Sequence, residues 1–400
     1  MTLTTAANRL RASRTLRVGV ALGLGVTVRA IATRATANTP RGLVDWQRAE
    51  RIARARLQRT PGRLTPRQLQ AAATAYARHM DRVVPLLERR LGAPLPGVVE
   101  RHAVVSREEW AAANMDTFKA LIRHLEPHLL PARPGDIVRG SVAAATNRLL
   151  TTGQIGFLLG YLGARVLGQY DVALLSAEQE PGRLLYVEEN IRATARAIDV
   201  PVDDFRLWVA LHETTHAFEL EAHPWLRPYL RSRIEQQVAL FARETRRLQR
   251  HGLAHLVRRW RTVASERSVR GLLGPEQRAL FRETQLVMSL MEGFSDWVMD
   301  EVGADLLPDV AGIRRRFDAR RGGRRRAIDR LMARLTGMDI KLEQYRRGER
   351  FVAGVYRAGG PVAIEHLWDG PAALPTEQEM DHPGEWVRRV TPQALGAGAR

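Results

Sequence analysis

Cysteine is absent from all 400 residues of the chain. Its absence excludes disulfide bonds, zinc sites built from thiolates and cysteine nucleophiles, because each of these needs a thiol. Any transition metal must therefore be held by histidine, aspartate or glutamate side chains. A chain without disulfides also fits a reducing compartment, so we expect a cytoplasmic protein.

Lysine is nearly absent, since only Lys119 and Lys341 occur, and arginine carries most of the formal net charge of +19. Such a charge would suit an acidic partner such as nucleic acid. The densest basic run, residues 314–326, holds one aromatic residue, Phe317, and no nucleic-acid-binding motif frames it. We interpret it as a solvated, charged helix-loop-helix and expect no nucleic-acid partner.

Long apolar runs are also missing. A helix needs about 20 apolar residues to span a bilayer, and charged residues interrupt every apolar stretch of this chain before that length. Near the N-terminus, Val18–Val28 comes after four arginines in the outline of a signal segment, but it is short and rich in glycine. Arg29 and Arg34 place charges directly after this run. We expect residues 1–42 to be a flexible basic tail, with export through this segment as the alternative to a cytoplasmic location.

A second apolar stretch, Ala143–Gln169, contains Gly156 and Gly160 at the spacing with which small residues let membrane helices pack closely. Arg148 and Arg165 lie in the same stretch and argue against a bilayer. We therefore predict a buried helix whose glycines admit a neighbouring helix. No integral membrane segment is expected.

Helical periodicity is the main pattern that is present. Apolar residues three and four apart predict amphipathic helices at Trp46–Leu57, Pro66–Leu91, Arg107–Leu130, Phe205–Glu221, Pro228–Arg250, Leu253–Val269, Pro275–Val302 and Arg324–Leu335. Two short strands, Asp171–Leu175 and Arg183–Val187, predict a small hairpin. Residues 354–400 are rich in glycine and proline and are expected to be mostly loop. The sequence predicts a mainly α fold, with one domain over residues 43–400 and a small β-hairpin or sheet next to helix 205–221.

That helix contains the sequence His212-Glu213-Thr214-Thr215-His216, an HExxH motif. Residues four apart lie on one helix face about 6 Å apart, so both imidazoles can bind one ion. Neutral imidazole suits zinc, and catalytic zinc sites use three protein ligands and keep one position open for water. Glu213 would stand beside that water as a general base. The motif therefore predicts a hydrolase with one zinc ion per chain.

The third ligand must come from elsewhere in the chain. A metzincin would have a histidine six residues after His216, but that position is Ala222. Glu219 lies about 10 Å along the helix axis from His212 at 1.5 Å per residue, which is too far for a shared ion, so we interpret it as a supporting carboxylate. Glu292 remains as the candidate, and Asp296 on the same helix face could orient a ligating histidine.

These features resemble the gluzincins. More closely, the chain from Val44 onward resembles the actinobacterial zincin-like proteins classed as zinc-dependent metalloproteases, some of which are linked to the biosynthesis of a deazaflavin coenzyme. The segments that carry this resemblance are Gly156–Gly163, His212–Arg227, Met291–Asp300 and Asp339–Tyr345.

The resemblance implies a zincin-like fold and a peptide or protein substrate. It also implies roles for five residues: His212, His216 and Glu292 as zinc ligands, Glu213 as general base and Asp296 as a carboxylate behind the ligands. The segment between His216 and Glu292 is longer than in compact gluzincins, so we expect additional helices to loop out between them.

Two other functions fit the same residues. Glu213 to His216 is also the Glu-x-x-His of ferritin-like di-iron oxidases, and Glu379 to His382 is a second copy, although Pro383 comes directly after it. Alternatively, the zincin fold could serve in binding or scaffolding without catalysis. Tyr345, His223 and Arg350 are eligible by type to stabilise an oxyanion.

Overall fold

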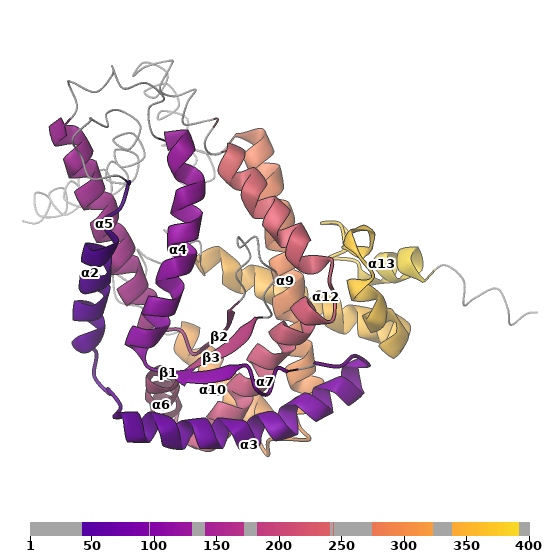
Figure 1. Ribbon diagram of the computed structural model, residues 1–400. Coiled ribbons are helices and arrows are strands. Elements are labelled where there is room, and N and C mark those ends of the chain that lie inside the picture. Colours follow the sequence, from indigo (N-terminus) through magenta and orange to yellow (C-terminus); the bar gives the residue numbers. More distant parts are fainter. Residues whose placement is uncertain are drawn as a thin grey trace, which may run out of the picture. The chain divides into compact units, whose positions relative to one another are not determined.

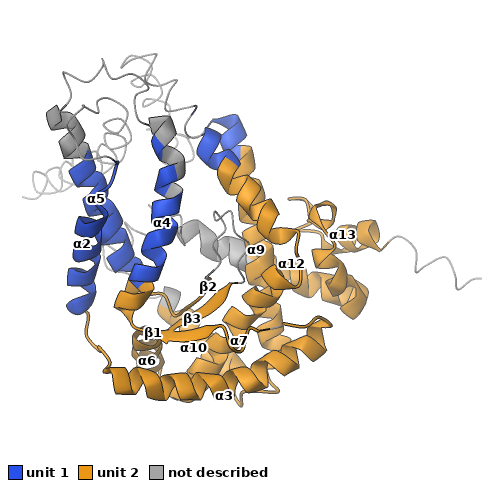
Figure 2. Ribbon diagram, viewed as in Figure 1, with its two compact units in different colours: residues 1–59, 111–162, 236–278 blue, residues 60–110, 163–235, 279–400 orange. Residues whose placement is uncertain are grey.

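The computed structural model of the protein describes residues 42–95, 97–129, 141–171, 182–240, 243, 274–322 and 338–391 (Figure 1). The predicted tail up to residue 41 and the predicted helices Leu253–Val269 and Arg324–Leu335 lie outside these ranges. The chain divides into two compact units, which Figure 2 colours separately. Unit 1 comprises residues 1–59, 111–162 and 236–278, and unit 2 comprises residues 60–110, 163–235 and 279–400. The single domain expected over residues 43–400 stays a prediction.

Unit 1 contains helix α2 (Trp46–Gln58), most of α4 (Arg107–Leu129) and nearly all of α5 (Ser141–Gly163). Its small core is formed by Val44, Ala49, Ala53, Met115, Ile155 and Leu159. A Cβ atom on Gly156 would lie 2.6 Å from the backbone oxygen of Ala49, and one on Gly160 would lie 3.2 Å from the Cα of Ala53. The two glycines therefore let α5 approach the backbone of α2, as predicted.

Unit 2 contains a three-stranded sheet with the strand order β1-β3-β2. β3 (Arg183–Val187) pairs in parallel with β1 (His102–Val105) and antiparallel with β2 (Gly168–Asp171). The prediction of β3 was correct. β2 begins three residues before the predicted strand, and β1 was not predicted, because four residues are too few to show a strand periodicity.

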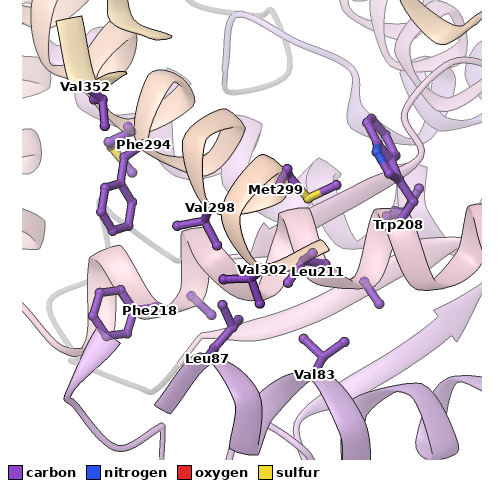
Figure 3. Close-up of a cluster of buried hydrophobic side chains, with 14 of the residues drawn as sticks. Val83, Leu87, Trp208, Leu211, Phe218, Phe294, Val298, Met299, Val302 and Val352 are labelled. Atoms are coloured by element: carbon purple, nitrogen blue, oxygen red, sulfur yellow. The ribbon is translucent and has the colours of Figure 1, made fainter. Parts of the chain in front are cut away.

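Helix α7 (Val202–Glu221) lies between the other elements of unit 2 and contacts α3 (Pro66–Leu91), α6 (Glu188–Ala197) and the sheet. Figure 3 shows Val83 and Leu87 of α3 beside α7, together with Val298 and Val302 of α9 (Pro275–Gly303). All four side chains belong to the large buried core of this unit. Because α7 is enclosed on several sides, apolar residues occur on most of its faces.

The C-terminal part of unit 2 is helical, and the expectation of mostly loop after residue 354 was wrong. α10 (Val310–Gly322) precedes α12 (Met338–Glu365), two short 3-10 turns and α13 (Pro383–Val390). A Cβ atom on Gly354 would lie 2.5 Å from Pro383, so this glycine makes room for α13. Glycine and proline serve helix packing here, whereas the sequence pattern was interpreted as loop.

The fold is thus mainly α with a small mixed sheet next to the helix of the HExxH motif, as predicted. Within the described ranges, no helix combines the length and apolar character that crossing a membrane requires.

Candidate metal centre

Helix α7 places His212 and His216 on one face, with their ring centroids 4.7 Å apart and their planes nearly perpendicular. Glu292 of α9 lies opposite, and its Oε2 atom is 4.0 Å from Nε2 of His212. One ligand atom from each of the three residues lies within 4.8 Å of the other two. The structure therefore brings together the three residues that the sequence suggested, although they come from helices far apart in the chain.

These residues fit a zinc ion. Two imidazoles and one carboxylate match catalytic zinc sites, in which bonds of about 2.0–2.2 Å place neighbouring ligand atoms roughly 3.3 Å apart. The observed separations are slightly larger, so small side-chain rotations would close them around an ion. All three side chains are partly buried, between 16% and 24% exposed, so each keeps some contact with solvent.

The residues that the structure describes contain no second grouping of this kind. In the second Glu-x-x-His sequence, the carboxylate of Glu379 accepts hydrogen bonds from Arg389 at 2.6 and 3.0 Å and from the backbone of Thr376. This carboxylate is therefore engaged in an ion pair, and the sequence lies just before α13, outside any long helix. This second copy is therefore not part of the grouping of His212, His216 and Glu292.

Behind His216 stands a buried carboxylate. Nδ1 of His216 lies 2.8 Å from Oε2 of Glu219, whose side chain is fully buried, and 3.2 Å from Oγ of Ser295. A histidine that donates from Nδ1 to a carboxylate presents Nε2 as its lone-pair donor. Glu219 thus supports a candidate ligand, as interpreted from the sequence.

Negative charge dominates this cluster. Burial raises the pKa of the Glu219 carboxyl group. Burial alone would lower the pKa of His216, but Glu219, and to a smaller extent Glu292 and Glu213, raise it above its ordinary value. Three carboxylates around one imidazole therefore favour a cation at this place, whether a proton or a metal ion.

Glu213 lies next to β2, one of the two edge strands of the sheet. A Cβ atom on Gly168 of β2 would stand 2.5 Å from Cγ and 2.7 Å from Oε1 of Glu213. The side chain of Glu213 therefore occupies the space that the missing side chain of Gly168 leaves. No sequence pattern indicates this contact, because the strand and the helix are joined only by the fold.

Asp296 lies one helical turn after Glu292 on α9, and Nη2 of Arg314 on α10 stands 3.4 Å from its carboxylate. Arg314 also pairs with Asp300 and Glu349, each at 2.8 Å. Its side chain is only 19% exposed, so the expectation of a solvated basic run was wrong at Arg314. The role of Asp296 in orienting a histidine stays a prediction.

An aromatic pair that sequence reasoning missed, Trp208 and Phe317, lies beside His212. The indole ring of Trp208, one turn earlier on α7, lies parallel to the imidazole, with ring centroids 6.2 Å apart. Phe317 of α10 packs edge-on against the same indole at 5.0 Å. The spacing of four residues between Trp208 and His212 was the available signal, since it puts both on one face.

Of the three residues eligible for an oxyanion role, the structure describes the side chains of two. His223 stacks on Trp368, with ring centroids 5.4 Å apart, and Arg350 is exposed. The side chain of Tyr345 lies outside the described part of the chain. Neither of these two observations connects His223 or Arg350 to the metal cluster.

A buried helix with two histidines and a glutamate, a carboxylate from a later helix and a small sheet beside them define a zincin-type metallohydrolase. The family of zincin-like metallopeptidases matches residues 44–387, and the chain belongs to this family. It is also similar to a solved structure from Chloroflexus aurantiacus, described as a provisionally assigned hydrolase with a novel fold. That similarity has a TM-score of 0.65 and 36% sequence identity, and covers 87% of this chain and 99% of the other. No curated protein matches the chain.

Proposed function

We propose that the protein is a zinc-dependent hydrolase that cleaves peptide bonds, with one zinc ion per chain held by His212, His216 and Glu292. The observation that carries the proposal is the convergence of three ligand atoms within 4.8 Å of one another. A bound zinc ion would supply a Lewis acid that activates water at neutral pH and polarises a substrate carbonyl group.

Glu213 is the general base in this proposal. It comes directly after the first histidine, and its charge reaches His216, since it contributes to the raised pKa of that imidazole. A carboxylate in this position takes the proton of the attacking water and returns it to the leaving amine. Gly168 leaves the space in which the carboxylate can sit between strand and site.

In this proposal, the hydrogen bond with Glu219 keeps the ring proton of His216 on Nδ1. With Nδ1 donating to the buried carboxylate, the lone pair on Nε2 is available to the ion at every turnover. Full burial of Glu219 keeps water from competing for this hydrogen bond.

A peptide substrate is supported by the position of β2. It is one of the two edge strands of the described sheet, and its residue Gly168 lies against the proposed base. Extended peptides bind to such sheet edges through backbone hydrogen bonds. A peptide on β2 would therefore pass close to Glu213.

The change Glu213→Gln tests the proposal. It removes the base but leaves the three ligands, so we expect hydrolysis of a mixed quenched-fluorescent peptide library to fall about 10²–10⁴-fold. Zinc content by elemental analysis should remain one ion per chain. Wild-type protein that binds zinc but cleaves no peptide would instead favour a binding or scaffolding role, and two irons per chain would favour a di-iron oxidase.

A further inference from the structure

Helices α9 and α12 touch backbone to backbone beside the candidate ligand Glu292. A Cβ atom on Gly348 of α12 would stand 1.8 Å from the carbonyl oxygen of Ser289 on α9. A Cβ atom on Gly293 would stand 2.2 Å from the carbonyl carbon of Gly348. Both clashes are with main-chain atoms, so no side-chain rotation could relieve them, and the two helices would have to separate.

The contact between α9 and α12 lies directly beside the candidate metal ligand Glu292. Ser289 and Gly293 are four residues apart and so share the face of α9 that meets α12. Glu292 immediately precedes Gly293 and points towards His212 on α7. Because a buried helix moves nearly as a rigid body, a displacement of α9 at Gly293 would move Glu292 by a similar distance.

Ion pairs join the same two helices next to this contact. Arg314 of α10 stands 2.8 Å from Glu349, the residue after Gly348, and 3.4 Å from Asp296, one turn beyond Glu292. Burial lowers the pKa of Arg314, but the carboxylates of Asp296, Asp300 and Glu349 outweigh it and raise the pKa above its ordinary value. The crossing is therefore held by close packing and by a shared guanidinium group.

We propose that the Gly293–Gly348 crossing is a positioning element that sets the reach of Glu292 towards the two histidines. The inference rests on the proposed zinc site. In zinc sites the ligand distances lie within about 0.2 Å of their usual values, whereas a methyl group at position 348 requires a shift of the helix backbone several times larger. A side chain there would weaken metal binding although residue 348 is not one of the three candidate ligands.

The test is the zinc affinity of the full-length protein, measured by competition with a chromophoric chelator. We expect Gly348→Ala to weaken zinc binding about 10–100-fold, the range for residues that orient metal ligands. Gly354→Ala is the matched control, because it introduces a clash on the same helix that faces Pro383 of α13. It should leave the affinity for zinc unchanged.

A double-mutant cycle tests whether Gly348→Ala weakens zinc binding through Glu292. If Gly348 acts through Glu292, then Gly348→Ala should weaken zinc binding little further once Glu292→Gln is present. Fully additive losses would overturn the proposal, as would a folded Gly348→Ala protein with wild-type affinity.

A milder variant covers the case in which Gly348→Ala does not fold. Glu349→Gln removes one ion pair of the crossing without adding volume, and should weaken zinc binding about 2–5-fold, also non-additively with Glu292→Gln. Unchanged affinity would then contradict the proposal. Wild-type protein that binds no zinc would refute the proposed function itself, whereas wild-type binding with unaffected variants would refute only the positioning role.

Discussion

At the scale of single residues, the position of the Glu213 side chain depends on a glycine in strand β2. Gly168 has no Cβ, and the carboxylate of Glu213 fills the space where one would lie. This arrangement lets the side chain of the proposed base pack against the backbone of β2. Gly168 has no reactive side chain, yet it helps to determine the position of the proposed base.

We therefore expect Gly168→Ala to lower kcat for peptide hydrolysis by about 10²-fold, since misplacing a catalytic group by about 1 Å has an effect of that size. Zinc affinity should not change, because Gly168 approaches the base and not the ligands. Gly153→Ala is the control, as a Cβ there meets nothing within 4 Å. Loss of zinc from Gly168→Ala would contradict this separation of base and ligands.

A second residue-scale effect concerns pH. Burial against Trp368 and Phe218 lowers the pKa of His223 to about 4, although Asp369 acts in the opposite direction. Between about pH 6.5 and pH 4 the unfolded chain binds a proton at His223 that the folded chain does not. The contribution of His223 to stability is thus complete above about pH 6.5 and is lost as the pH falls towards 4.

Replacing His223 by phenylalanine removes this titration. From pH 7.5 to pH 5, we expect the free energy of unfolding to fall by about 1–2 kcal/mol more in the wild type than in His223→Phe. Urea denaturation at the two pH values measures the difference. Equal losses in both proteins would show that His223 does not titrate in this way.

At the scale of elements, the sequence predicted what local periodicity determines. α3 was predicted with both its ends from its apolar periodicity. The structure shows that Thr65 and Gln68 form a capping box at its start and that Gly92, with φ of 71°, ends it. The HExxH helix and α9 were also predicted from their apolar periodicity. The two histidines came from the HExxH motif, and Glu292 remained as the candidate after positions 222 and 219 were set aside. Local pattern and chemistry were sufficient for these parts.

The elements that were missed depend on contacts made in three dimensions. β1 is held by its parallel pairing with β3, about 80 residues later. α12 and α13 contain glycines that look like loop formers, yet Gly354 serves the packing of one helix on the other. Gly168 beside Glu213 and Gly348 beside Ser289 likewise become visible only when distant segments meet.

At the scale of the whole molecule, all the candidate zinc ligands belong to unit 2. A ligand that binds only the folded state stabilises it by RT ln(1 + [L]/Kd), about 2.7 kcal/mol at one hundred times Kd. We expect zinc to stabilise the core of unit 2 and a chelator to reverse the effect.

Hydrogen exchange monitored by mass spectrometry, with and without a chelator, measures this effect. Peptides from α7 and α9 should exchange faster once zinc is removed, whereas peptides from outside the site, such as α13, serve as the reference. Exchange of α7 and α9 that does not respond to zinc would contradict the assignment of the site to these helices.

The two histidines and Glu292 are separated by more than seventy residues of chain. During synthesis on the ribosome, the histidines therefore emerge well before the carboxylate that completes their site. Two imidazoles alone hold zinc weakly, so the nascent chain can retain the ion firmly only after α9 has emerged and docked on α7. Acquisition of the metal would thus be a late event in the production of this protein, and a chain truncated before α9 would carry the HExxH sequence without a working site.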